Sequence, residues 1–107
     1  MSKKISASHI LIMHEQSESS RSTLTKQDAK KKIAALLVKV NKDPKLFNDI
    51  AISNSDCGSA QAGGSLGEFS EGMMVKPFED VAFKLEKGQI SEIVETIFGY
   101  HIIKRDA

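Results

Sequence analysis

The sequence predicts an α+β domain in which helices pack around an antiparallel sheet. Segments with the two-residue periodicity of strands lie near both ends of the chain, and segments with helical periodicity lie between them. The chain has 107 residues, of which 40% are hydrophobic, and this is enough for one domain with one core. No internal repeat or linker divides the sequence. We therefore expect a single domain over residues 1–107.

The first strand is expected over residues 5–13, where alternate side chains point to opposite faces. Residues 14–24 are polar and rich in serine, which is typical of an exposed loop. The next segment predicts a helix over residues 26–40 that is capped by Thr25. An apolar stripe marks the buried face of this helix: Ala29, Ile33, Leu36, Leu37 and Val40.

A second, shorter helix is expected to begin at Asp43-Pro44 and to end near Asn54. Aspartate caps a helix, and proline suits its first position because no intrahelical partner is lost there. Residues 58–62 predict one further helical turn, and residues 65–69 predict a short strand.

The last part of the chain predicts a helix and a hairpin. Pro77 is expected to open the helix, whose apolar residues follow at i, i+3, i+4 and i+7, and Gly88 is expected to end it. Two strands, over residues 90–97 and 100–105, are expected to form a hairpin around Phe98-Gly99. The order strand, helices, strand, helix, strand, strand is the basis of the α+β assignment.

Composition narrows the class of protein. No apolar run reaches the roughly 18 residues that a membrane helix needs, and the N-terminus lacks the apolar core of a secretion signal. The single cysteine cannot form an internal disulfide, which fits a reducing compartment. We therefore expect a cytoplasmic protein, with the nucleus as a second compartment.

Charge is unevenly distributed along the chain. Residues 1–45 hold 10 Lys/Arg and 4 Asp/Glu, whereas residues 46–107 hold 5 Lys/Arg and 10 Asp/Glu. A basic half could attract nucleic acid or an acidic partner. No aromatic residues are interleaved with the lysines, so a solvated lysine-rich helix explains the pattern better. Nucleic acid is therefore not an expected partner.

Two histidines occupy strand positions that normally carry apolar residues. His9 lies in the first predicted strand and His101 in the last, and the only cysteine, Cys57, lies in a Ser/Gly-rich stretch between them. A buried imidazole is costly unless its nitrogens find partners. Thr96 is placed on the facing arm of the hairpin and can fix the tautomer of a histidine. These four residues are the candidate catalytic cluster.

Two other kinds of site fit these residues less well. A covalent Cys-His hydrolase needs an oxyanion hole and usually an orienting group, and the sequence indicates neither. A metal site is disfavoured because the three histidines, the third being His14, show none of the i, i+3 or i, i+4 spacings common in metal sites. We expect no metal and no cofactor.

A small apolar pocket is also expected. Leu66, Met74 and Phe78 are its candidate lining residues, although ordinary core burial would explain each of them singly. Met73-Met74 follows a glycine in a predicted loop, and methionine side chains adapt to bound apolar shapes.

Three segments together resemble the parvulin-type peptidyl-prolyl cis/trans isomerases. They are SHILIMH at residues 8–14, SDCGSAQAGGSLGEFSEGMMVKPFEDVAFKL at residues 55–85 and GQISEIVETIFGYHIIKR at residues 88–105. The resemblance covers almost the whole chain, and the combination of GGSLGEF, KPFEDVAF and FGYHII is specific. It implies an FKBP-like superfold with a four-stranded antiparallel sheet surrounded by four helices, one of them short.

The resemblance also implies roles for individual residues. His9 and His101 match the paired histidines of the family, Cys57 matches the cysteine or aspartate beside them, and Thr96 matches the threonine that hydrogen-bonds a histidine. The positions that match the proline-binding residues and their aromatic neighbours are Leu66, Met74, Phe78, Phe69 and Phe98.

One region departs from the phosphate-specific members of the family. Those members carry a basic cluster after the first strand, whereas this chain has Glu15 and Glu18 there, with only Arg21 close by. Carboxylates repel a phosphate, so we expect little preference for phosphorylated substrates. The tryptophan-containing binding domain attached to some members is not expected within this sequence, which has no tryptophan.

Three functions follow as alternatives. The first is an isomerase that accelerates rotation about X-Pro bonds in flexible or folding proteins and works as a monomer. The second is a module of the same fold that binds X-Pro segments with little turnover. The third is a nucleic-acid-associated adaptor that acts through the basic half. The presence of both histidines, Cys57 and Thr96 favours the isomerase.

Overall fold

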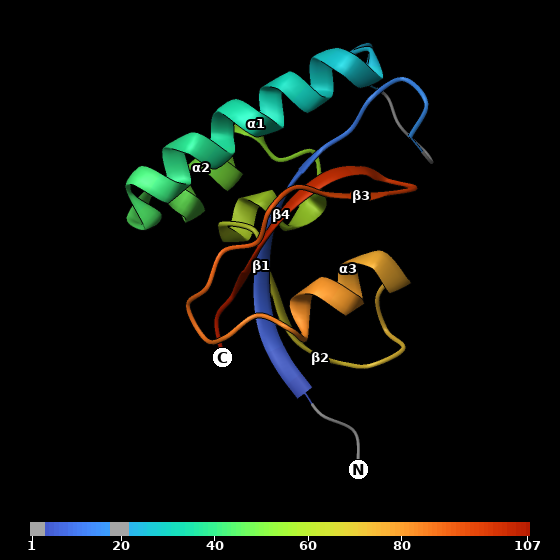
Figure 1. The fold of residues 1–107 in the computed structure, drawn as a ribbon. Coiled ribbons are helices and arrows are strands. Elements are labelled where there is room, and N and C mark those ends of the chain that lie inside the picture. The colour runs from blue at the N-terminus through green and yellow to red at the C-terminus, as the bar shows by residue number, and fades with distance from the viewer. Residues whose placement is uncertain (1–3, 18–21) are drawn as a thin grey trace.

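The computed structural model describes residues 4–17 and 22–107. Four strands form one antiparallel sheet: β1 (Lys4–Ile12), β2 (Ser65–Ser70), β3 (Val94–Thr96) and β4 (Gly99–Arg105). Their order across the sheet is β2-β1-β4-β3. The first and last strands of the chain are thus the two central ones (Figure 1). This confirms the predicted α+β class and its four-stranded antiparallel sheet.

Three α-helices surround the sheet: α1 (Lys26–Lys42), α2 (Phe47–Asn54) and α3 (Lys76–Ala82). Two 3₁₀ segments, η1 (Pro44–Leu46) and η2 (Gly58–Ala62), complete the regular structure of the described residues. The expected number of four helices is met only if η2 is counted as the short one. α1 begins as predicted, since the Asp28 N–H donates to the Thr25 hydroxyl at 3.1 Å.

The sheet separates two apolar cores. Even-numbered residues of the central strands, such as Ile10 and Ile102, pack against α1 and α2. Odd-numbered residues, such as Ala7 and Ile103, pack against α3 and the aromatic residue Phe69 of β2. Figure 1 shows α1 on one side of the central strands and α3 on the other. Burial on both faces explains why nearly all of β1 is buried.

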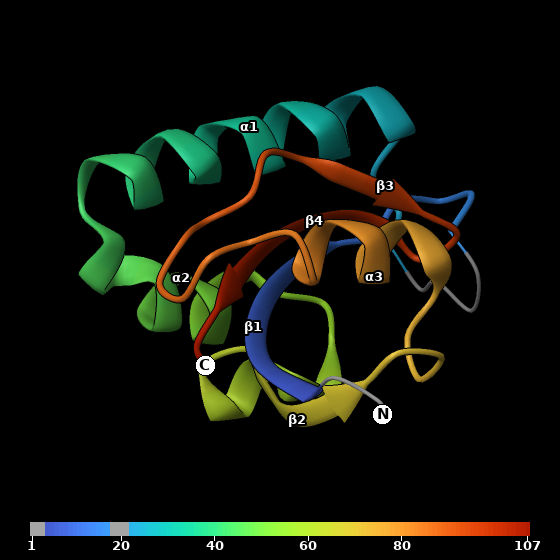
Figure 2. The ribbon, with the colours of Figure 1, turned by 60° about the horizontal axis from the view of Figure 1, so that its bottom comes forward.

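β1 bends between its two neighbours, as Figure 2 shows. Its pairing with β2 shifts register between Ser6 and Ser8, which is the mark of a β-bulge. A bulge sharpens the local bend and twist of a strand. His9 lies directly after this irregularity, and its N–H donates to Gly64 O just before β2 begins.

Two predicted elements are shorter in the structure. The strand expected over residues 90–97 is reduced to β3, because the Ser91 hydroxyl accepts the Ile103 N–H at 2.9 Å in place of a backbone carbonyl. Ile90 keeps only an isolated bridge to Lys104. The helix expected from Pro77 toward Gly88 ends at Ala82, and beyond it the Gly88 N–H donates to Arg105 O at 2.7 Å on β4.

Two turns also differ from the prediction. The hairpin turn falls on residues 97–98, one position earlier than Phe98-Gly99, since Thr96 pairs with Gly99. His14 was expected in an exposed loop but is buried. Its N–H donates to the Ser17 hydroxyl at 3.0 Å, and its ring packs 5.8 Å from that of Tyr100. These contacts fold residues 14–17 back onto the sheet.

Within residues 4–17 and 22–107, no helix combines the length and the apolar character that crossing a membrane would require.

Candidate active site

The centre of the site is a pair of imidazoles on neighbouring strands. His9 lies opposite Ile103, and His101 lies opposite Leu11, so the two histidines are diagonal neighbours on the same face of the sheet. Their Nδ1 atoms are 3.1 Å apart, and their rings stack with centroids 5.2 Å apart. Both side chains are buried. The structure thus brings together two residues that the sequence places near opposite ends of the chain.

Thr96 holds the second imidazole from behind. Its hydroxyl oxygen is 2.7 Å from His101 Nε2, and it also accepts the Phe98 N–H at 3.1 Å. Burial, together with the nearby charge of His9, lowers the pKa of His101 to about 3. His101 is therefore a neutral imidazole at neutral pH.

A neutral imidazole has one donor and one acceptor nitrogen, so the bonds of this cluster must run in a common direction. If the Thr96 hydroxyl donates to His101 Nε2, then His101 Nδ1–H donates to His9 Nδ1 and leaves a proton on His9 Nε2. In the reverse arrangement, His9 Nε2 is the acceptor. While His9 is neutral, the state of its Nε2 is thus tied to the tautomer of His101; a charged His9 carries a proton on Nε2 and on Nδ1.

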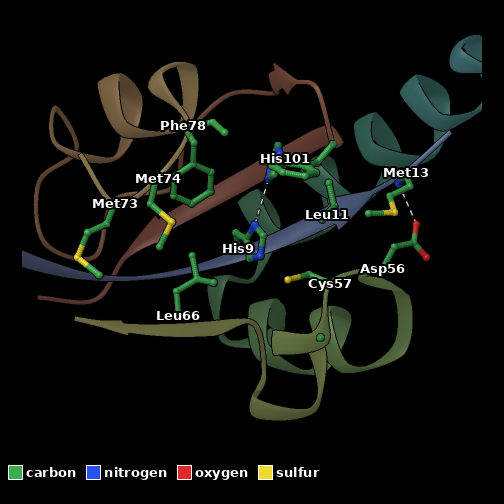
Figure 3. Close-up of a pocket in the computed structure, with 13 residues that line it drawn as sticks. His9, Leu11, Met13, Asp56, Cys57, Leu66, Met73, Met74, Phe78 and His101 are labelled. Atoms are coloured by element: carbon green, nitrogen blue, oxygen red, sulfur yellow. Dashed lines mark hydrogen bonds between the residues drawn. The ribbon is translucent and has the colours of Figure 1, made fainter. Parts of the chain in front are cut away.

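Cys57 is positioned by the segment that precedes it. After Ser8, β1 no longer pairs with β2, and residues 55–56 form hydrogen bonds with β1 instead. Leu11 N–H donates to the Ser55 hydroxyl at 3.0 Å, and Asp56 N–H donates to Leu11 O at 2.7 Å. The next residue, Cys57, directly precedes η2. Figure 3 shows its sulfur pointing toward the His9 ring.

The environment of the thiol favours its ionised form. The interaction with His9 is the main reason that the pKa of Cys57 falls to about 6; burial opposes this shift and Ser59 supports it. His9 Nε2 is buried, and no group of the described residues meets strict hydrogen-bond geometry with it. The thiol is the polar group that faces the ring. A proton on His9 Nε2 and a thiolate on Cys57 are mutually stabilising.

Gly64 fixes the backbone of His9. The His9 N–H donates to Gly64 O at 2.9 Å, and a Cβ atom added at Gly64 would lie 2.4 Å from His9 O. The φ angle of Gly64 is +87°, a region that favours glycine. Only glycine allows the chain to pass this close to the first histidine.

A cavity of about 480 Å³ opens above the cluster. Figure 3 shows three regions in it. Leu66, Met73, Met74 and Phe78 gather at one end. His9, Leu11, His101 and Cys57 lie in the middle, and Met13 and Asp56 lie at the other end.

Aromatic contacts join the apolar end to the imidazoles. The ring of Phe78 meets His9 edge-on at 5.5 Å and His101 edge-on at 5.3 Å, measured between centroids. Phe69 lies behind Phe78, with ring centroids 6.3 Å apart, and does not line the cavity. Phe98 lines it directly.

Of the nine candidate residues, seven line the cavity, whereas Thr96 and Phe69 support it from behind. Sequence reasoning did not name Leu11, Met13 or Asp56 as site residues. The sequence carried a signal for Leu11 and Met13, because they follow His9 at every second position of the predicted strand and so lie on the same face. Asp56 precedes Cys57 in the sequence, but its orientation depends on hydrogen bonds to β1. Within the described part of the chain, no group of three or more His, Cys, Asp or Glu residues could hold a metal ion.

Comparison with known proteins decides what this arrangement is. The family model for the PPIC-type peptidyl-prolyl isomerase domain, also called rotamase, matches residues 9–107. The chain belongs to the parvulin family of peptidyl-prolyl cis/trans isomerases. It is a parvulin-type isomerase, and its substrates are peptide segments that contain proline.

Individual relatives agree with this assignment. The peptidyl-prolyl cis-trans isomerase Pin1 of Digitalis lanata is 44% identical over 97% of this chain and 97% of its own length. Pin1 of Schizosaccharomyces pombe is 43% identical over 99% of this chain, which spans 64% of that protein. In the solved structure of the isomerase ESS1 from Candida albicans, the matching region has a TM-score of 0.94 and 32% identity; it covers 97% of the parvulin described here and 63% of ESS1.

Proposed function

We propose that this parvulin holds the proline ring in the apolar end of its cavity while the preceding carbonyl rotates above the imidazoles and the thiol. No covalent intermediate forms. The observation that carries this proposal is the placement of His9, His101 and Cys57 directly beside the apolar side chains, within one cavity.

The energetic task is modest compared with bond cleavage. Rotation about an X-Pro amide crosses a barrier of roughly 18–20 kcal/mol, because twisting removes the resonance of the amide. Uncatalysed exchange takes about 10–100 s. An acceleration of about 10⁵ requires about 7 kcal/mol of preferential binding of the twisted state. The enzyme can supply this energy in two ways. It can hold the proline side of the bond still, and it can provide a suitable environment for the carbonyl side.

The apolar end of the cavity supplies the fixed half. Leu66, Met74 and Phe78 surround a space suited to a pyrrolidine ring, and Phe69 supports Phe78 from behind. Phe98 borders the cavity on the β3–β4 side. A twisted amide has less charge separation than a planar one, so these apolar surroundings favour it over the ground state.

Cys57 acts on the rotating carbonyl without attacking it. Its thiol polarises the surroundings of the carbonyl, while the two imidazoles set the shape and protonation of the site. Thr96 fixes the tautomer of His101. A nucleophilic mechanism would call for a group that orients the base, yet the partner of His9 Nδ1 is a neutral imidazole rather than a carboxylate.

The site is also proposed to lack a preference for phosphorylated substrates. Asp56 lines the cavity, Glu15 is exposed on the segment after β1, and no Lys or Arg of the described residues lines the cavity. Glu18 and Arg21, which also entered the sequence prediction, lie outside the described residues. Negative side chains at this place repel a phosphate.

We further infer that residues 1–107 form a single parvulin domain, which is monomeric and acts on proline-containing client proteins in the cytoplasm or nucleus, without a nucleic-acid partner. A single unpaired cysteine with a lowered pKa suits a reducing compartment. The lysines of α1 are exposed and lie on a helix whose apolar stripe is already buried, as expected of an ordinary solvated face.

The test is cis/trans exchange of a proline peptide, measured by NMR with the wild type and three variants. We expect Cys57→Asp to keep measurable catalysis, and Cys57→Ala and Cys57→Ser to lose it in part. Complete loss in a folded Cys57→Asp protein would contradict the noncovalent role. Binding shifts without faster exchange in the wild type would indicate a proline-binding module instead.

A further inference from the structure

The end of the cavity opposite the apolar side chains carries a fixed carboxylate. Asp56 Oδ2 accepts the Met13 N–H at 2.8 Å, and the Asp56 N–H donates to Leu11 O at 2.7 Å. These bonds hold the residue against β1, where it lines the cavity and remains exposed to solvent. In residues 4–17 and 22–107, no lysine or arginine lines this cavity or forms an ion pair with Asp56. The carboxylate is therefore a negative charge without a cationic partner in the described structure.

The three regions of the cavity dictate which part of a substrate meets this charge. If the proline ring occupies the apolar end and its preceding carbonyl lies over the imidazoles, the residue before proline points toward Met13 and Asp56 (Figure 3). Neighbouring Cα atoms are about 3.8 Å apart across a trans bond and about 2.9 Å across a cis bond. A long side chain on that residue therefore reaches the charged end in either isomer.

We propose that Asp56 makes this enzyme select X-Pro segments in which the residue before proline is lysine or arginine. This inference rests on the proposed function. The aliphatic stem of such a side chain packs on Met13, and its cationic head pairs with the Asp56 carboxylate. The Cys57 thiolate, favoured by its lowered pKa, adds a second negative charge to the lining at neutral pH. A glutamate before proline meets repulsion from both.

The experiment compares kcat/KM for peptides that differ only in the residue before proline, which is lysine, leucine or glutamate. In the wild type at low salt, we expect lysine to exceed glutamate by about fivefold, the effect of a well-formed exposed ion pair. Asp56→Asn keeps an oxygen that accepts the Met13 N–H but removes the charge, so the lysine-to-glutamate ratio should fall toward one. Any change that affects all peptides alike cancels in this ratio.

The matched control is Asp49→Asn, which removes an exposed carboxylate from α2, away from the cavity lining. It should leave the ratio as in the wild type. Added salt should lower the wild-type ratio, because it screens exposed charges, and this measurement needs no variant.

The outcomes separate the two proposals. Each of three results, obtained while the leucine peptide is turned over, would overturn the role of Asp56 but not the proposed function. They are a lysine-to-glutamate ratio of one or less, a ratio that Asp56→Asn does not change, and a ratio that salt does not change. Failure of the wild type to isomerise any of the three peptides would overturn the proposed function, and this inference with it.

Discussion

His9 and His101 contact each other through their Nδ1 atoms at 3.1 Å, although 92 positions separate them in the sequence. The register of β1 and β4 produces this contact, since it makes the two residues diagonal neighbours on one face. A shift by one residue would turn one imidazole toward α1 and the opposite core. The site is therefore a direct product of strand pairing, and perturbations of either strand should be measurable at the thiol that faces His9.

The ionisation of Cys57 gives the first prediction. Because this is the only cysteine of the chain, thiolate absorbance or the rate of alkylation reports on it alone. The midpoint should lie near pH 6, as its lowered pKa implies. His9→Asn removes the main cause and should move the midpoint toward the ordinary value of 9.0. His14→Asn, at a buried histidine outside the cavity lining, is the control and should not move it. An unchanged midpoint in His9→Asn would refute the assignment.

Thr96 gives the second prediction. Thr96→Val is nearly isosteric but leaves His101 Nε2 and the Phe98 N–H without their partner. A buried polar atom left unpaired costs about 1–3 kcal/mol in the free energy of unfolding, which urea denaturation measures. Isomerase activity should fall as well, because the tautomer of His101 is no longer fixed. Thr96→Ser keeps the hydroxyl and should restore most of both. A loss in Thr96→Ser as large as that in Thr96→Val would contradict the assignment, because Thr96→Ser keeps the hydroxyl that holds His101.

The third prediction concerns stability at low pH. The pKa of His101 is about 3 in the folded protein, against an ordinary value of 6.5. Between these values the unfolded chain binds a proton that the folded protein does not, so the stability present above pH 6.5 is lost as the pH falls toward 3. The loss should approach about 1 kcal/mol per pH unit for this group.

The corresponding variant is His101→Asn, which removes this titration. Its deficit in unfolding free energy relative to the wild type should shrink between about pH 7 and about pH 5. A deficit that is the same at both pH values would mean that His101 does not titrate differently in the folded and unfolded states.

Two glycines of the same neighbourhood provide the fourth prediction. Gly64→Ala would place a Cβ atom 2.4 Å from His9 O, whereas Gly67→Ala has a similar positive φ but nothing within 4 Å of the new atom. Gly67→Ala should cost about 1–2 kcal/mol of stability from backbone strain alone. Gly64→Ala should cost about 1–3 kcal/mol more, since His9 must move, and should also reduce kcat/KM. Equal stability losses would show that the close approach is not strained.

Sequence reasoning recovered the elements whose signals are local. The capping threonine and the apolar stripe of α1 depend on spacing alone, and both are present. The predictions failed where a side chain replaces the backbone in pairing: Ser91 interrupts the strand expected over residues 90–97, and no periodicity reveals such a hydrogen bond. The burial of His14 depends likewise on tertiary contact with Tyr100.

In the candidate site, too, residues with a local signal were predicted and those that depend on tertiary contacts were not. The unusual residue types, two histidines on strands and one cysteine, were visible in the sequence, and the predicted hairpin placed Thr96 beside His101. The resemblance supplied Phe69 and Phe98. The orientation of Asp56 into the cavity was not visible, because it follows from hydrogen bonds that residues 55–56 make with β1. Long-range pairing of this kind has no pattern in the sequence that would indicate it.

The central position of β1 and β4 has a consequence for synthesis of the protein. β1 leaves the ribosome before the other three strands of the sheet, whereas its partner along most of its length, β4, follows all of them. A nascent chain that ends before residue 99 can form α1 and α2, yet it must keep β1 from other partners until translation reaches the final strand. A pairing of such wide sequence separation also slows folding of the complete chain. An enzyme that removes proline-limited delays in other chains thus has a late, long-range step of its own to complete.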